Sequence, residues 1–219
     1  MLSTALTVGC SSPLYIWQTH TTATPRPPAF DVAELAGPVA TFTVVTPGAL
    51  QGFGPSLSRA LTRAVSNASP PLRELPAYQV ASMLTEHGLV SDYADLLVNF
   101  PKNGILDRER LQRLGTALGC HYVLLPGIAA FSQVVADRFE IGGIKLLRNQ
   151  ITILRLWLQI WDARTGSMLW ESAGEITVAS DILSAGRSVP LHDVAAKLWL
   201  AMINDGIAGR TKSGTLLSY

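Results

Sequence analysis

The chain carries little charge, and the charge it has is balanced. Asp, Glu, Lys and Arg make up 15% of its 219 residues, against about 25% in typical soluble domains, and 17 basic and 16 acidic residues give a net charge of +1. A polyanion is attracted by concentrated positive charge, which is missing here, so nucleic acid is not expected as a partner. A surface this poor in charge favours association with other molecules.

Metal ligands and nucleophiles are also scarce. The spacing of the four histidines and two cysteines matches no zinc-binding pattern, and no glycine pair is followed by the Lys-Ser/Thr of a phosphate-binding loop. We therefore expect no metal, no cofactor and no enzymatic activity. Cys120 stands at the entrance of an apolar run, where the expected role is that of a small buried side chain. The histidines are His20, His87, His121 and His192.

Apolar residues are plentiful but occur in no run of the roughly 20 that a transmembrane helix needs. Hydrophobic residues form 48% of the chain, enough for a substantial core. We predict a single folded domain at residues 39–206. A flexible tether rich in Thr and Pro is expected at 11–38, and a loose tail at 207–219.

Hydrophobic periodicity within that domain predicts four strands and five helices. Pro126 inside one of the strands indicates an edge position or a bulge, because proline cannot donate to a ladder. The order of the elements predicts an α+β fold built in layers, with a mostly antiparallel sheet and helices packed on one face. The strands are expected at 40–46, 122–135, 151–161 and 168–179, and the helices around 57–65, 77–87, 91–100, 107–118 and 191–204. Asp107 is expected to cap the fourth of these helices.

The strand at 151–161 has the clearest alternation. Leucine and isoleucine occupy its even positions from 154 to 160, and the turn at 162–167 returns the chain as an antiparallel hairpin. The expected register places Arg155 opposite Glu175, a favourable cross-strand pair.

The opposite face of that strand is the main candidate for an interaction surface. Trp157 and Trp161 lie there together with Arg155 and Gln159. If helices cover the leucine face, these side chains emerge on the other side, where aromatic residues often anchor an interface. The alternative is that the two rings pack beneath the tail or beneath the segment 131–150.

Cys10 follows a short apolar stretch, and the run Leu-Thr-Val-Gly-Cys resembles the lipobox of bacterial lipoproteins. The resemblance implies that residues 1–10 are a partial signal peptide and that Cys10 is diacylated as the mature amino terminus. Ser11 after the cysteine then implies sorting to the periplasmic face of the outer membrane. Each buried methylene of an acyl chain contributes about 0.8 kcal/mol, so several chains anchor a domain stably. The alternative is an accidental cysteine in a frayed terminus.

Two further runs resemble envelope proteins. Gly-x-x-Tyr-Val-Leu at 119–124 and Asp-x-x-Thr-Gly at 162–166 are similar to lipoproteins of the curli-secretion-channel and penicillin-binding-protein-activator type. The amino-terminal domain of the Tol-system propeller protein is similar in architecture. The resemblance implies a noncatalytic role in the bacterial envelope, with other envelope proteins or further copies of this chain as partners, in a ring or larger machine. The alternative is a periplasmic domain that binds a small molecule or peptidoglycan beside the exposed sheet face.

Overall fold

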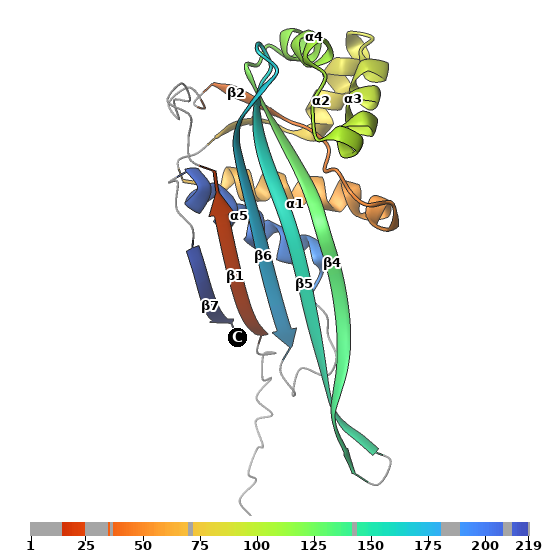
Figure 1. Cartoon of the computed structure of the whole chain (residues 1–219), viewed down its shortest axis with the longest axis vertical. Coiled ribbons are helices and arrows are strands. Elements are labelled where there is room, and N and C mark those ends of the chain that lie inside the picture. Colours follow the sequence, from red (N-terminus) through yellow and green to blue (C-terminus); the bar gives the residue numbers. More distant parts are fainter. Residues whose placement is uncertain are drawn as a thin grey trace, which may run out of the picture.

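A seven-stranded sheet in the order β3-β2-β4-β5-β6-β1-β7 forms the centre of the molecule (Figure 1). The structure is a computed structural model, which describes residues 15–24, 35, 37–69, 72–141, 144–180, 189–207 and 212–218. β2 pairs in parallel with β3 and β4, and the remaining pairs are antiparallel. The predicted α+β fold with a mostly antiparallel sheet is confirmed.

The elements have the following bounds. The strands are β1 (Tyr15–Ala23), β2 (Pro38–Thr41), β3 (Arg73–Leu75), β4 (Tyr122–Ile141), β5 (Ile144–Asp162), β6 (Ser167–Ser180) and β7 (Lys212–Ser218). The helices are α1 (Gly54–Ser66), α2 (Ala77–Glu86), α3 (Val90–Asn103), α4 (Arg108–Leu118) and α5 (Leu191–Ile207), with a 3-10 helix, η2 (Gly48–Phe53), before α1. None of the described helices is long and apolar enough to span a bilayer.

Helices cover both faces of the sheet, where the sequence led us to expect one. α1 and α5 pack on the face that carries Leu124 and Leu158, whereas α2, α3 and α4 pack at one end of the other face, on Val123, Leu125 and Trp161 (Figure 1). At this end β4 and β5 are apolar on both sides, as strands buried on two faces must be. In the rest of β5 apolar and polar side chains alternate, and this pattern led us to expect that only one face of the sheet is covered.

Residues 15–23, expected as part of the tether, form a strand instead. β1 lies between β6 and β7, and the Trp17 side chain is only 5% exposed. The Lys197 ammonium lies 3.9 Å from the centroid of that ring, and Thr21 Oγ1 donates to Asp205 Oδ2 at 3.1 Å. Gln18, His20 and Thr22 lie on the exposed face of β1, and Thr21 is buried on the same face as Trp17. Polar residues on both faces made the segment look like a spacer.

The predicted tail also contains a strand. β7 pairs with β1, so the proposed limits of 39 and 206 leave out two strands that belong to the same sheet. Neither strand pairs with a neighbour in sequence, which is why local patterns did not reveal them.

Several local predictions are confirmed. Arg155 pairs with Glu175, helped by a bulge between Ile160 and Trp161 that corrects the register beyond the turn. Asp107 caps α4 by accepting a hydrogen bond from the Arg110 backbone N–H at 2.9 Å. β4 is a central strand, so the edge position suggested by its proline is wrong, but the alternative, a bulge, occurs just beyond it.

We expect the substitution Trp17→Ala to lower the free energy of unfolding by about 3–5 kcal/mol, since it removes a large buried ring from the contact between β1 and α5. Denaturant unfolding measures the change. Gln18→Ala, on the exposed face of the same strand, serves as the control and should change stability by less than about 0.5 kcal/mol. Equal effects of the two substitutions would show that β1 is not part of the core.

Candidate functional site

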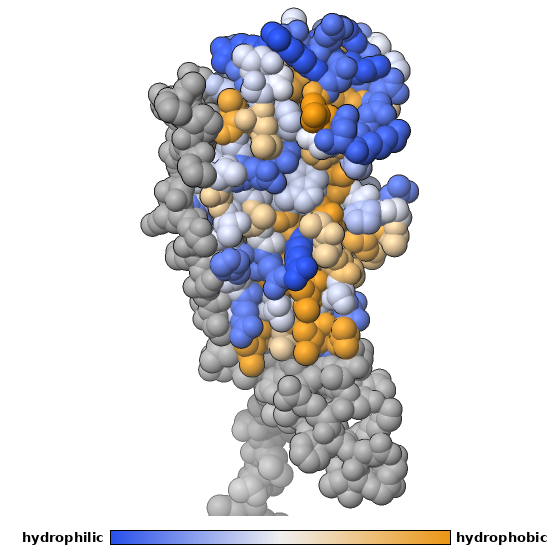
Figure 2. All heavy atoms as spheres, viewed as in Figure 1, coloured by the Kyte–Doolittle hydropathy of each residue, from blue (hydrophilic) through white to orange (hydrophobic). Residues whose placement is uncertain are grey.

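The part of the sheet that α2, α3 and α4 leave uncovered is the candidate site. Figure 2 shows this face, on which hydrophobic and hydrophilic side chains are interspersed over the strands. Cross-strand pairing aligns His20, Glu175 and Arg155 in one row, and the next row toward α3 contains Trp157. β1 and the β5–β6 hairpin, which are distant in sequence, therefore contribute to one surface.

The Trp157 ring packs against the neighbouring strand β4 and against α3. Its ring lies over Gly127, where an added Cβ would come within 2.0 Å of the ring carbon Cζ2. On the α3 side it contacts Phe100, with 5.5 Å between ring centroids. The indole is only partly buried, so the site presents a preorganised aromatic surface.

Two hollows flank this ring, and together we call them the Trp157 groove. The first, of about 400 Å³, lies beside the C-terminal end of α3, and the second, of about 390 Å³, lies over β1, β5 and β6. Both volumes are within the range of about 300–1,000 Å³ that is common for ligand sites. Trp157 and Glu171 line both hollows, with Phe100, Ile128 and Gln159 in the first and His20, Arg155 and Glu175 in the second.

Two of the charged groups of the groove, Arg155 and Glu175, form an exposed ion pair, and Glu171 also lines the groove. Arg155 Nε donates to Glu175 Oε2, and the two side chains are 61% and 40% exposed. Such a pair contributes about 0–1 kcal/mol to stability because water competes for both charges. The pair therefore adds a positive and a negative group to the surface with little consequence for the fold.

The four predicted interface residues separate into two groups. Arg155 and Trp157 face the groove, and Gln159 borders it while being 9% exposed. Trp161 is 4% exposed, packs edge-on against Phe100, and donates from Nε1 to Gln159 Oε1 at 3.0 Å. α3 covers it, rather than either of the segments considered from the sequence.

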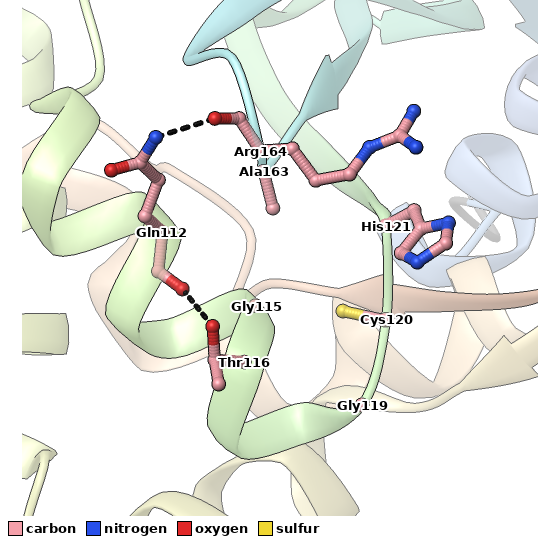
Figure 3. A pocket seen from close by; sticks show the side chains of 8 residues that line it. All are labelled: Gln112, Gly115, Thr116, Gly119, Cys120, His121, Ala163 and Arg164. Carbon is pink, nitrogen blue, oxygen red and sulfur yellow. Dashed lines mark hydrogen bonds between the residues drawn. The ribbon is translucent and has the colours of Figure 1, made fainter.

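A third hollow, of about 550 Å³, lies between the C-terminal end of α4 and the β5–β6 turn (Figure 3). Its polar groups stabilise the turn: Gln112 Nε2 donates to the Arg164 carbonyl oxygen, and Arg164 forms an ion pair with Asp162 at 3.2 Å. Burial raises the pKa of Asp162, but the hydrogen bonds and charge of Arg164 outweigh it and hold that pKa below its ordinary value.

Cys120 borders the same hollow but is 4% exposed, which confirms the predicted core role. Burial raises the pKa of its thiol to about 11, so the group is a neutral thiol at physiological pH and a poor nucleophile. Among the described residues, no group of three or more His, Cys, Asp or Glu side chains is placed to hold a metal ion. Cys10, the predicted lipidation site, lies outside the described residues.

Gly127 is the residue of the site that sequence reasoning missed. It follows Pro126, and a glycine inside a strand can mark the close approach of another group. Here that group is the Trp157 ring, from the neighbouring strand β5.

Comparison with known proteins gives a limited result. No family model matches the chain, and no curated protein matches it significantly. Among solved structures it is similar to the PelC dodecamer from Paraburkholderia phytofirmans, with 14% identity, a TM-score of 0.43, and coverage of 84% of this chain and 94% of that chain.

Two further solved structures are similar to a comparable degree. Lipoprotein GNA1162 from Neisseria meningitidis has 16% identity and a TM-score of 0.43, over 76% of this chain and 97% of that chain. The LpoB C-terminal domain from Salmonella enterica has 15% identity and a TM-score of 0.39, over 64% and 82%. TM-scores below 0.5 at such identities indicate a distant likeness in chain path, and they do not bear on what this chain binds.

We expect Gly127→Ala to lower the free energy of unfolding by about 1–3 kcal/mol, because the new methyl group displaces the Trp157 ring from its position over the strand. Denaturant unfolding gives the stability, and near-ultraviolet circular dichroism reports the ring environment. Gly48→Ala is the control, since nothing lies within 4 Å of a Cβ built there. An unchanged aromatic spectrum in Gly127→Ala would contradict the packing described.

The raised pKa of Cys120 predicts a pH dependence. The unfolded chain loses the thiol proton near pH 9, whereas the native state keeps it until about pH 11. The free energy of unfolding should therefore fall by up to about 1.4 kcal/mol per pH unit within this window. Urea unfolding of the wild type and of Cys120→Ala at pH 8, 9, 10 and 11 tests this, because the difference between the two proteins should change only above pH 9.

Proposed function

We propose that this chain is a noncatalytic lipoprotein of the bacterial envelope, anchored through Cys10 at the periplasmic face of the outer membrane, whose Trp157 groove binds another protein. The observation that carries the binding proposal is the Trp157 ring, partly exposed yet fixed by Gly127 and Phe100. A fixed aromatic ring loses little conformational entropy on binding, and Trp and Arg are the residues most enriched at binding hot spots.

The charges around the groove favour another protein as its partner over a polyanion. Arg155 and Glu175 place opposite charges next to the ring, and His20 lies in the same row. A surface with both signs selects a partner by complementary placement, and like charges in a wrong partner are penalised. The near-zero net charge of the chain supports the same choice.

The noncatalytic part of the proposal is supported by the roles of the groups that could do chemistry. The Cys120 thiol is buried and protonated, Asp162 holds the β5–β6 turn through Arg164, and Glu175 is paired with Arg155. The first two groups have structural roles, and the third is held in an ion pair.

A second candidate function is the binding of a small molecule or a peptidoglycan fragment in the same groove. It is favoured by the size of the two hollows beside Trp157, each close to 400 Å³. Titration with soluble peptidoglycan fragments should then quench or shift tryptophan emission in the wild type, and the change should disappear in Trp157→Phe. Under the protein-binding proposal the fragments leave the emission unchanged.

The anchoring proposal predicts that Cys10→Ser releases the protein from the membrane fraction into the soluble periplasm, because the acyl chains provide most of the membrane affinity. Cell fractionation measures the distribution, and mass spectrometry of the parent detects the acyl groups. Ser11→Ala is the control and should stay with the membrane. An unmodified Cys10 in the parent would contradict the proposal.

Binding through the groove is tested with a photo-crosslinking amino acid at position 173, an exposed site beside the ring. We expect a protein adduct in intact envelopes, and a loss of about tenfold or more of it when Trp157→Ala is added, as for a hot-spot aromatic residue. Met168→Ala, an exposed apolar side chain at the far end of β6, is the matched control. The adduct mass distinguishes another protein from a second copy, and an adduct insensitive to Trp157→Ala would contradict the proposal.

A further inference from the structure

Beyond Ile128, strand β4 has a free edge on the side away from β5. β2 pairs with β4 only near its beginning, at 122–124, and farther along the Ile128 N–H donates to the Val45 carbonyl oxygen at 3.0 Å. From there β4 continues beside β5, and no other described strand pairs with it (Figure 1). The outer side of β4 over residues 129–134 is therefore open to a further strand.

The register shows which backbone groups point to this side. Ile128 directs its N–H outward, and in an antiparallel ladder this direction alternates from one residue to the next. The bulge after Ile128 adds one residue to β4, so beyond it the odd positions point outward. The N–H and C=O groups of Phe131 and Gln133 therefore face away from β5 and pair with no described strand, whereas those of Ser132 bond to β5.

Apart from the bulge, this edge lacks the usual protection against strand addition. Natural proteins guard free edges with short strands, charged side chains or proline. β3, the edge strand beside β2, is three residues long and carries Arg73 and Glu74. Residues 129–134 of β4, by contrast, contain neither a charge nor a proline, and Val134 is 51% exposed. This part of β4 is thus suited to pairing with a further strand.

The free edge begins where the Trp157 groove opens. Ile128 lines the first hollow and Ala129 the second, and Trp157 lines both. Residues directly opposite each other in a sheet point to the same face, and Ala130 is opposite Arg155, which lines the groove. A residue that pairs with Ala130 from outside therefore directs its side chain to the groove face. An added strand combines backbone hydrogen bonds to β4 with a side chain in the groove, the mode known as β-augmentation.

The surroundings of the free edge favour a single extended segment over a second copy of this chain. At one end the edge stops at Thr46 and Pro47, which line the first hollow together with Pro101 of α3. β4 itself continues as a strand to Ile141. If two copies paired their β4 edges about a twofold axis, the far part of each β4 would run into residues 45–47 and α3 of the other copy. A segment without a sheet of its own meets no such obstacle.

We propose that the partner protein of the Trp157 groove binds through an extended segment, which joins the sheet as a strand beside residues 129–134 of β4 and places an apolar side chain against Trp157. This inference rests on the proposed binding of a protein in the groove. Backbone hydrogen bonds supply affinity that depends little on the partner's sequence, and the groove selects the side chain. An apolar side chain fits because Phe100 and Ile128 line the hollow on this side of the ring.

A proline on the edge tests the strand addition. Gln133→Pro removes an N–H that points outward and places a ring where the added strand would lie, whereas the bonds to β5 are made by the neighbouring residues. Gln133→Ala is the matched control, because it removes the same side-chain contact with Thr152 and keeps the N–H. With the photo-crosslinking amino acid at position 173, we expect the partner adduct to fall at least tenfold in Gln133→Pro and less than twofold in Gln133→Ala. Circular dichroism and urea unfolding check that both variants are folded.

The positions of the crosslinks provide a second test that needs no proline variant. The photo-crosslinking amino acid is placed at 132 and at 134 in turn, both on the groove face, and mass spectrometry identifies the partner residues that react. An added strand gives adducts on one peptide, at positions about two residues apart. Adducts on unrelated peptides, or no adducts, would overturn the inference.

The outcomes separate this inference from the proposed function. A position-173 adduct that is lost in Trp157→Ala but kept in folded Gln133→Pro would overturn the strand addition and leave the groove as the binding site. An adduct insensitive to both substitutions would overturn both proposals. Crosslinks from 132 and 134 to this chain's own sequence would identify a second copy as the occupant and overturn the choice of another protein.

Discussion

The ladder between β4 and β5 is the constraint on which the rest of the structure depends. It joins the parallel part of the sheet, β3 and β2, to the antiparallel part, and its residues contribute to both hydrophobic cores. Near the turn with β6 both of its faces are covered, whereas toward the hairpin one face is open. The bulge at Ile128 lies close to the point where this change occurs, and the Trp157 groove is formed there.

The open face exists because the helices differ in length and position. α5 runs along the sheet and covers β1, β5 and β6 from one side, whereas α2, α3 and α4 cover only the end of the other side. The short β2 contributes Ala40 and the adjoining Phe42 to that second core. The end of α3, with its Phe100, then becomes one wall of the groove.

How much of this could be predicted from the sequence depends on how local each interaction is. The Arg155–Glu175 pair, the Asp107 cap and the buried Cys120 follow from neighbours in sequence, and these predictions were confirmed. β1 and β7 pair with strands far away in the chain, so no local pattern distinguishes them from a tether and a tail. The different exposure of Trp157 and Trp161 also depends on a distant part of the chain. Both rings lie on one face of β5, and the position of α3 decides which of them is covered.

The adjacency of β1 and β7 has a consequence for how the protein is made. The first and last strands of the described chain are neighbours in the sheet, so the pairing of β1 with β7 cannot form until residues 212–218 have been synthesised. Contacts between distant parts of the chain slow folding, because the loop must close before the contacts stabilise it. β7 is an edge strand that pairs only with β1, so it is the last strand to join the sheet, and β1 keeps one unpaired edge until then.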